Sequence, residues 1–206
     1  MAGDETQRRR KSTRQAIDRK SDKNAYLICH SLPMYSSKQN FSEACETALN
    51  KQVNMELGAS YSYMSMSVFC SKDGVALPGL AAYCAKMSLE ERDHALMLQD
   101  YIIKRGGQVT YDTIAPHPKA SAWKSALEIV EAMLELEKSV NVSLLDLNKL
   151  ASLKEDAHLS DFIEGTFLSE QVDSIKELVD MLVQLQRAGV DGLGLYIWDQ
   201  NLLSKN

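Results

Sequence analysis

The sequence "GGQVTYDTIAPHPKAS", residues 106–121, separates two long helical patterns without forming a tight turn between them, and it therefore determines how the helices are connected. Gly106 and Gly107 are expected to end the preceding helix. At about 3.3 Å per residue, an extended segment of this length reaches about 50 Å, whereas a helix of about 27 residues is only about 40 Å long. The segment can therefore cross a whole helical bundle, and the helices on its two sides are predicted to be parallel.

Apolar residues recur at steps of three and four from Ser42 onward, which is the spacing of a buried helix face. The short turn "KDGVALP", residues 72–78, and a link of a few residues before residue 158 each join helices that must be antiparallel. The predicted helices span residues 42–71, 78–105, 122–153 and 158–188. The predicted architecture is two antiparallel hairpins joined by one long crossover.

A fifth segment, "LYIWDQNLL" at residues 195–203, has little polar face. A terminal helix this apolar is expected to be buried, and we expect other subunits to cover it.

The composition predicts one globular domain with an additional arm, since 45% of the 206 residues are apolar and 25% are charged. We place the arm at residues 1–40 and the domain at residues 41–206. The four cysteines form no C-x-x-C pair, which favours reduced thiols over a disulfide framework. No apolar run is long enough to cross a bilayer, and "AYLICH", residues 25–30, lies too late for a signal peptide. These features predict a cytoplasmic protein with no membrane partner.

Charge is unevenly distributed, because residues 1–40 carry a net charge of +5 and the remaining residues carry −10. The basic run "RRRKSTR", residues 8–14, is open to several interpretations: nucleic-acid binding, nuclear entry, a transit peptide or a solvated disordered tail. We favour the tail. Acidic residues within the arm weaken the transit-peptide interpretation.

Strongly polar residues interrupt the apolar face of every predicted long helix at one level, near the helix midpoint. Tyr63 faces inward two turns from the first of them. The residues expected to converge in the middle of the bundle are Glu56, Glu91, His94, Glu137 and Gln171.

Three carboxylates cannot remain ionised together in a core unless something compensates for desolvation and repulsion. No Lys or Arg lies on the same faces, so the alternatives are protonated carboxyl groups or bound cations. One buried Glu would favour protonation, whereas the whole set favours cations. Carboxylates with one imidazole and no thiolate indicate iron or manganese, with zinc as a competitor.

Glu91 is placed to bridge two ions, with Glu56 and His94 on one side and Glu137 on the other. Two adjacent ferrous ions can deliver two electrons to dioxygen together. The motif "EDAH", residues 155–158, repeats the three-residue spacing between Glu91 and His94. It falls at a turn, however, and we interpret it as part of a helix end.

At these residues the chain resembles a ferritin subunit of the heavy, ferroxidase type. The matching motifs are "NKQVNMELGASYSYMSMS", "LEERDHA", "LEKSVNVSLLDLNKLA", "HLSDFIEGTFLSEQVDSIKEL" and "GLYIWDQNLL", which together extend over about residues 40–206. The resemblance implies an all-α fold, a ferritin-like four-helix bundle with one long crossover and a short fifth C-terminal helix. It also implies a homo-oligomeric or mixed shell of 24 subunits that takes ferrous iron and dioxygen as substrates and stores ferric mineral. The ferroxidase-centre positions implied are Glu56, Tyr63, Glu91, His94, Glu137 and Gln171.

Asp161 and Glu164 match the acidic residues of the family's threefold channel, where they would bind entering ferrous ions. Without the resemblance, both would be interpreted as favourable charges near a helix N-terminus. Glu90 and Asp93 correspond to acidic positions near the inner surface, although Leu96 replaces a third acid often found there.

Two other functions remain as alternatives. One is a di-iron oxidoreductase acting on an organic substrate, but such enzymes typically repeat Glu-x-x-His on a second helix, where this chain has Glu170, Gln171 and Ser174. The other is a DNA-associated mini-ferritin, which would place its metal between subunits and lack the fifth helix. We therefore favour an iron-storing ferroxidase and expect no nucleic-acid partner.

Overall fold

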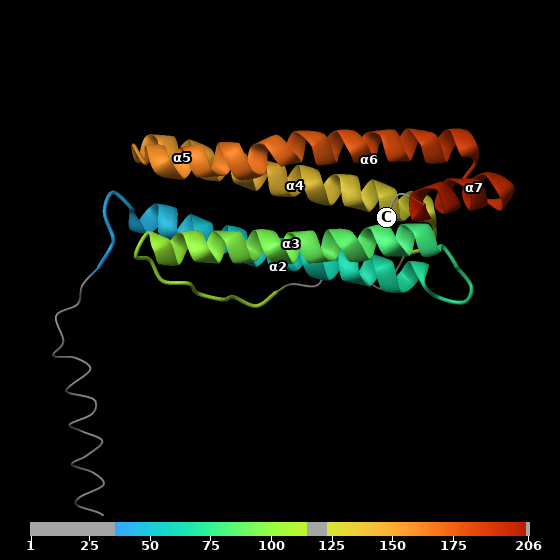
Figure 1. Ribbon diagram of the computed structural model, residues 1–206, viewed down its shortest axis with the longest axis horizontal. Helices are drawn as coiled ribbons and strands as arrows, with labels where there is room; N and C mark the ends of the chain where they lie inside the picture. Colours follow the sequence, from blue (N-terminus) through green and yellow to red (C-terminus); the bar gives the residue numbers. More distant parts are fainter. Residues whose placement is uncertain (1–35, 115–122, 205–206) are drawn as a thin grey trace, which may run out of the picture. The chain divides into compact units, whose positions relative to one another are not determined.

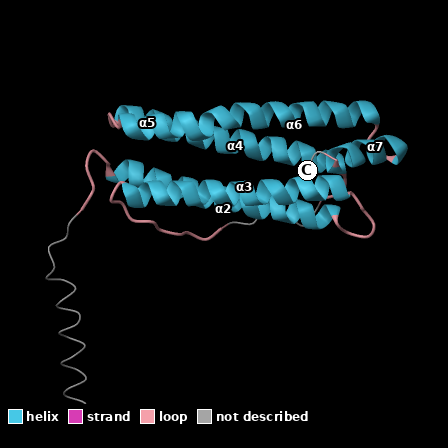
Figure 2. Ribbon diagram, viewed as in Figure 1, coloured by secondary structure: helices cyan, strands magenta, loops and turns pink. Residues whose placement is uncertain are grey.

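A computed structural model describes residues 36–114 and 123–204, and within these ranges it contains helices and no strands (Figures 1 and 2). Most of the arm predicted at residues 1–40 lies outside the described residues. The helices are α2 (Glu43–Cys70), α3 (Pro78–Lys104), α4 (Ala126–Leu153), α5 (Ala157–Ile163), a π-helical segment η1 (Glu164–Leu168), α6 (Ser169–Ala188) and α7 (Gly192–Leu203).

The long helices form the predicted pair of antiparallel hairpins: α2 packs against α3, and α4 packs against α6 (Figure 1). The crossover leaves the end of α3 and runs along α2. Asn50 Nδ2 donates to Gln108 O at 3.0 Å, and Asn54 Nδ2, one turn further along α2, donates to Thr113 O at 3.4 Å. The four-helix bundle with a single crossover is therefore confirmed, although residues 115–122 lie outside the described ranges.

Side-chain caps explain where two of the helices begin. Ser42 Oγ accepts from the Cys45 backbone N–H at 3.1 Å at the start of α2. Ser125 Oγ accepts from the Glu128 N–H at 3.2 Å, so α4 begins at Ala126 rather than at the predicted residue 122.

The fourth predicted helix is not a continuous α-helix, because the π-helical segment η1 separates α5 from α6. The motif at residues 155–158 lies at a helix start, as interpreted from the sequence. Asp156 caps α5 by accepting from the Leu159 N–H at 3.1 Å. His158 points to Tyr101 Oη, 3.1 Å from its Nδ1 atom.

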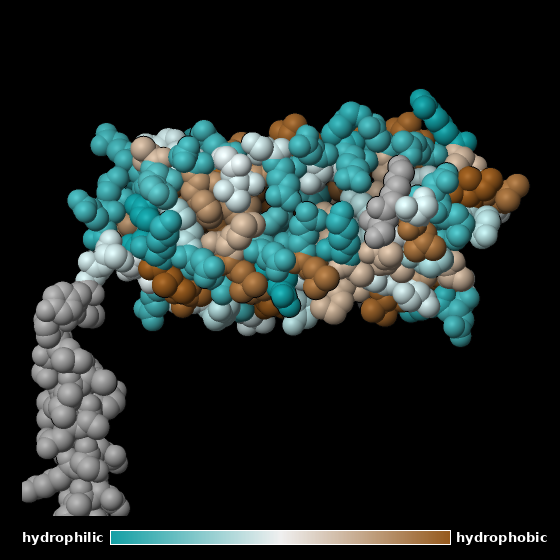
Figure 3. Space-filling model, viewed as in Figure 1, coloured by the Kyte–Doolittle hydropathy of each residue, from teal (hydrophilic) through white to brown (hydrophobic). Residues whose placement is uncertain are grey.

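Helix α7 packs on the first turn of α3 and supplies its missing cap. Leu77, the residue before α3, makes no side-chain cap. Instead, the buried Asp199 carboxylate accepts from the backbone N–H groups of Gly79 and Leu80 at 3.1 and 2.8 Å. The opposite side of α7 remains apolar and exposed, at the right-hand end of the surface in Figure 3. Its large exposed residues are Leu193, Tyr196, Ile197 and Leu203.

The core consists of two apolar clusters separated by polar residues. One cluster lies toward the α2–α3 turn and includes Met87 and Met133, and the other includes Leu98 and Val140. The residues between the clusters, which we call the polar layer, are Glu56, Glu91, His94, Glu137 and Gln171. None of the described helices has both the length and the apolar character that a bilayer-spanning helix needs.

Candidate metal centre

The polar layer draws one or two side chains from every long helix. Glu56 comes from α2, Glu91 and His94 come from α3, Glu137 comes from α4 and Gln171 comes from α6. Each of the five is buried, with at most 8% of its surface exposed. The fully buried Tyr63 lies against the same layer from α2. The structure therefore brings together all six residues predicted for a ferroxidase centre.

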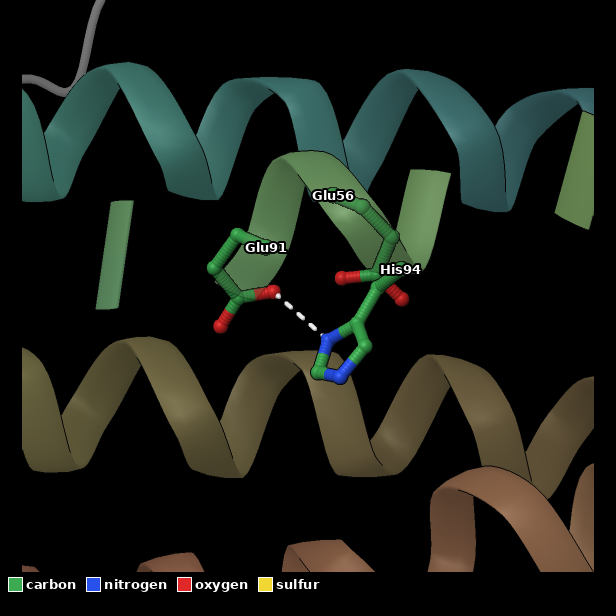
Figure 4. Close-up of side chains that lie close together, drawn as sticks. All are labelled: Glu56, Glu91 and His94. Carbon is green, nitrogen blue, oxygen red and sulfur yellow. Dashed lines mark hydrogen bonds and ion pairs between the residues drawn. The ribbon is translucent and has the colours of Figure 1, made fainter. Parts of the chain in front are cut away.

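Glu56, Glu91 and His94 form the tightest group in the layer (Figure 4). One potential ligand atom from each lies within 4.8 Å of the others. His94 Nδ1 is 3.4 Å from Glu91 Oε2. This spacing allows a single cation to contact two carboxylates and an imidazole.

Glu137 lies outside this group of three and is held by two hydrogen bonds. Tyr63 Oη donates to its Oε1 atom at 2.5 Å, and Gln171 Nε2 donates to its Oε2 atom at 2.9 Å. Its charge contributes to raising the pKa of Glu91, which is consistent with the two carboxylates lying on adjacent sides of one site.

Burial dominates the electrostatics of the group of three. It raises the pKa of Glu56 well above its ordinary value, and the nearby Glu91 charge adds to the effect. Burial also raises the pKa of Glu91 to about 7. Burial opposes protonation of His94, but hydrogen bonds from its ring to Glu170 and Glu91 outweigh burial and raise the pKa of His94 to about 11. Without a metal, the site thus limits its negative charge by holding protons, which a bound cation would displace.

Two buried oxygen atoms of the layer have no hydrogen-bond partner among the described residues: Glu56 Oε2 and Gln171 Oε1. Leaving such an acceptor unsatisfied typically costs about 1–3 kcal/mol. A metal ion would satisfy both, since carboxylate and amide oxygens are ligands for hard or borderline cations. The residues present therefore fit a metal centre that is rich in oxygen and has one nitrogen ligand.

Comparison with known proteins places the chain in a family. Residues 46–188 match the family described as the ferritin-like domain. The chain belongs to the ferritin-like family. A soma ferritin from Lymnaea stagnalis is 47% identical to it over 170 residues, covering 82% of this chain and 97% of that protein.

Two further relatives align with this chain over almost their whole length. A ferritin heavy chain from Echinococcus granulosus is 46% identical over 166 residues, covering 81% of this chain and 95% of the relative. A ferritin middle subunit from Aquarana catesbeiana is 43% identical over 171 residues, covering 82% and 97%. The predicted membership of the ferritins is confirmed, and the heavy-chain relative is consistent with the heavy type.

The structure adds Gln52 and Ser143, which sequence reasoning missed, to the surroundings of this candidate centre. Gln52 Nε2 donates to Glu56 Oε1 at 2.7 Å, and Ser143 Oγ donates to Gln52 Oε1 at 2.5 Å. This pair holds one carboxylate oxygen of Glu56 and leaves the other free. Gln52 lies one helical turn before Glu56, so the sequence places it near the same face, but the sequence does not show its hydrogen bond.

Glu170 is a third residue beside the candidate centre that sequence reasoning missed. Its Oε1 atom is 3.2 Å from His94 Nε2, so His94 Nδ1 is the ring atom that faces Glu91. A carboxylate on the outer nitrogen is the usual arrangement for a histidine that binds metal. Hydrogen bonding to His94 lowers the pKa of Glu170, which favours the charged form needed for this contact.

Asp161 and Glu164 do not take part in this centre. Both are exposed, and Glu164 Oε1 accepts from Asn148 Nδ2 at 2.8 Å. Their predicted role in a channel depends on neighbouring subunits.

Proposed function

We propose that this chain is a ferroxidase that oxidises ferrous iron with dioxygen and stores the ferric product in a shell of 24 subunits. The observation that carries the proposal is the buried group of Glu56, Glu91 and His94, which includes a carboxylate oxygen without a hydrogen-bond partner that a cation could bind. The names of the three ferritin relatives support the same function.

The residues of the centre would bind two ferrous ions. Glu56, Glu91 and His94 would bind the first ion, and Glu91 would share the second with Glu137 and Gln171. The two ions together reduce dioxygen by two electrons, 2 Fe²⁺ + O₂ + 2 H⁺ → 2 Fe³⁺ + H₂O₂. Tyr63 would hold Glu137 in place through its hydrogen bond. Iron is the substrate here, so its ligands must release it after oxidation.

Exposed residues would serve iron entry and assembly of the shell. Asp161 and Glu164 would bind ferrous ions that enter between subunits, and their exposure on the isolated chain is compatible with that role. The apolar side of α7 would be covered by other copies of the chain, because an exposed apolar surface of this kind favours association.

The decisive test is Glu91→Gln, which keeps the size of the side chain and removes the proposed bridging carboxylate. We expect the initial rate of ferrous oxidation, measured by oxygen consumption, to fall by at least about tenfold because a ligand is lost. Glu155→Gln is the matched control, since Glu155 belongs to the similar motif at a helix start outside the centre. Light scattering after size-exclusion chromatography should show an assembled shell for both variants. An unchanged rate in Glu91→Gln would rule out this centre.

A further inference from the structure

We infer that Tyr101 donates an electron to the iron centre, through three aromatic rings, when hydrogen peroxide is the oxidant and only one ferrous ion is bound. This inference rests on the proposed iron chemistry and adds a second redox group to it. The three rings are those of Phe162, Phe167 and His94, and together with Tyr101 we call them the ring chain.

The ring chain is a continuous series of contacts from the centre to the end of α3. The His94 and Phe167 rings are 5.6 Å apart between centroids, and the Phe167 and Phe162 rings are 5.5 Å apart. Phe162 then stacks on Tyr101 at 4.1 Å with an interplanar angle of 7°. These separations are typical of packed aromatic pairs or slightly closer. The span is short, because His94 and Tyr101 lie two turns, or about 10 Å, apart on α3.

The π-helical segment makes the middle contact possible. Phe162 and Phe167 are five residues apart, and on an α-helix they would point about 140° away from each other. The segment Glu164–Leu168 replaces the α-helical pattern with the wider i→i+5 turn between them. Residues five apart are brought toward the same face, and Phe167 thereby contacts both Phe162 and His94.

Tyr101 also has a route for its proton. Arg105 can only donate, so its hydrogen bond to Tyr101 Oη leaves the phenolic hydrogen for His158 Nδ1, 3.1 Å away. Burial raises the pKa of Tyr101, so the group is a neutral phenol before oxidation. His158 is exposed and can pass the proton to solvent. The guanidinium of Arg105 is balanced by Asp156, 2.9 Å away.

The proposed step completes the reduction of peroxide. One ferrous ion alone transfers one electron to hydrogen peroxide, which breaks the O–O bond and releases a hydroxyl radical. With a second electron from Tyr101 the reaction is Fe²⁺ + Tyr–OH + H₂O₂ + H⁺ → Fe³⁺ + Tyr–O• + 2 H₂O. The phenolic proton leaves through His158, and the tyrosyl radical remains at the end of α3, away from the metal ligands.

Tyr63 is the obvious competitor, because it lies nearer the centre and hydrogen-bonds to Glu137. It differs from Tyr101 in its surroundings. Tyr63 is fully buried and its hydrogen-bond partner is itself a buried carboxylate. Among the described residues, a proton released there has no exposed acceptor comparable to His158, which favours Tyr101 as the lasting radical site.

The test uses the assembled full chain loaded without oxygen with one ferrous ion per subunit and then mixed with one equivalent of hydrogen peroxide. Freeze-quench electron paramagnetic resonance should detect a tyrosyl radical, and a spin trap should report little hydroxyl radical. Tyr101→Phe should lose the tyrosyl signal and increase the spin-trap adduct. Phe167→Leu should decrease the tyrosyl signal although Tyr101 is present.

Tyr61→Phe is the matched control, because Tyr61 is 56% exposed on α2 and outside the ring chain. It should keep the radical of the unmodified protein. A tyrosyl signal of equal yield in Tyr101→Phe would overturn the inference and assign the radical elsewhere, as would an unchanged signal in Phe167→Leu. Ferrous oxidation by dioxygen, measured separately on the same set of variants, distinguishes the two proposals. If that oxidation occurs but the radical does not depend on Tyr101, only this inference fails; if no iron is oxidised, the proposed function fails with it.

Discussion

At the scale of single residues, the state of Glu56 depends on an amide one turn away. Gln52 donates to Glu56 Oε1 and is itself held by Ser143. This hydrogen bond lowers the pKa of Glu56 against the larger effect of burial, so it favours the charged carboxylate, the form that would bind a cation. A neutral amide thus favours the charged form of a proposed metal ligand.

We predict that Gln52→Met weakens the binding of ferrous iron by about tenfold, the lower end of the effect typical of residues that orient metal ligands. The substitution keeps the length of the side chain and removes the N–H donor. Calorimetric titration with ferrous iron under anaerobic conditions measures the affinity. Gln99→Met is the control, since Gln99 bonds to Tyr111 and does not contact the centre. Equal affinities in the two variants would contradict a positioning role for Gln52.

Periodicity was sufficient to predict which polar residues meet in the core, but not the residues that orient them. Glu56, Glu91 and Glu137 stand out because a carboxylate on a buried helix face violates the apolar pattern. Gln52 and Glu170 orient Glu56 and His94 through hydrogen bonds. Whether such a bond forms depends on side-chain torsions, which the spacing of residues along a helix does not predict. Stepping three residues back from Glu56 selects Val53, whereas stepping four selects Gln52.

At the scale of elements, the contact between α3 and α7 requires a glycine. A Cβ atom on Gly79 would lie 2.0 Å from the Asp199 carbonyl oxygen, so α7 would have to move. Movement of α7 would also withdraw the Asp199 carboxylate from the N–H groups at the start of α3. The first turn of α3 and the position of the last helix are therefore coupled.

We predict opposite effects for two glycine-to-alanine substitutions. Gly79→Ala should destabilise the protein by about 1–3 kcal/mol, the usual range for overpacking. Gly58→Ala should stabilise α2 by up to about 1 kcal/mol, because alanine favours helix and the nearest atom to its Cβ is 4.0 Å away. Differential scanning calorimetry compares the two melting temperatures with that of the unmodified chain. A shift in the same direction for both would refute the proposed contact.

The helices themselves were predictable because their caps and breaks are local. The predicted and observed limits of α2 and α3 differ by one residue at most at each end. The π-helical segment was not predictable, since residues 158–188 keep an unbroken helical pattern and "EGTFL" contains no residue that demands a wider turn. Its position reflects packing of Phe162 and Phe167 against α3, and that is tertiary information.

At the scale of the whole molecule, one chain supplies all the proposed ligands of the metal centre but leaves an apolar part of its surface uncovered. All the proposed ligands come from a single bundle, whereas α7 leaves large apolar residues exposed. The sequence predicted this difference because the fifth segment lacks a polar face. The number of subunits was not predictable from physical chemistry alone, since it depends on the angle at which copies meet, and that part of the expectation came from family resemblance.

The apolar side of α7 provides the test of assembly. We predict that Ile197→Glu prevents formation of the closed shell, because Ile197 is 50% exposed on that side and a buried unpaired carboxylate would be costly between subunits. Ile197→Leu keeps the apolar volume and should assemble normally. Light scattering after size-exclusion chromatography measures the mass of each variant. Because the ligands belong to one chain, Ile197→Glu should still bind ferrous iron at the centre even as smaller assemblies. A shell of normal mass in Ile197→Glu would show that α7 is not part of the subunit contacts.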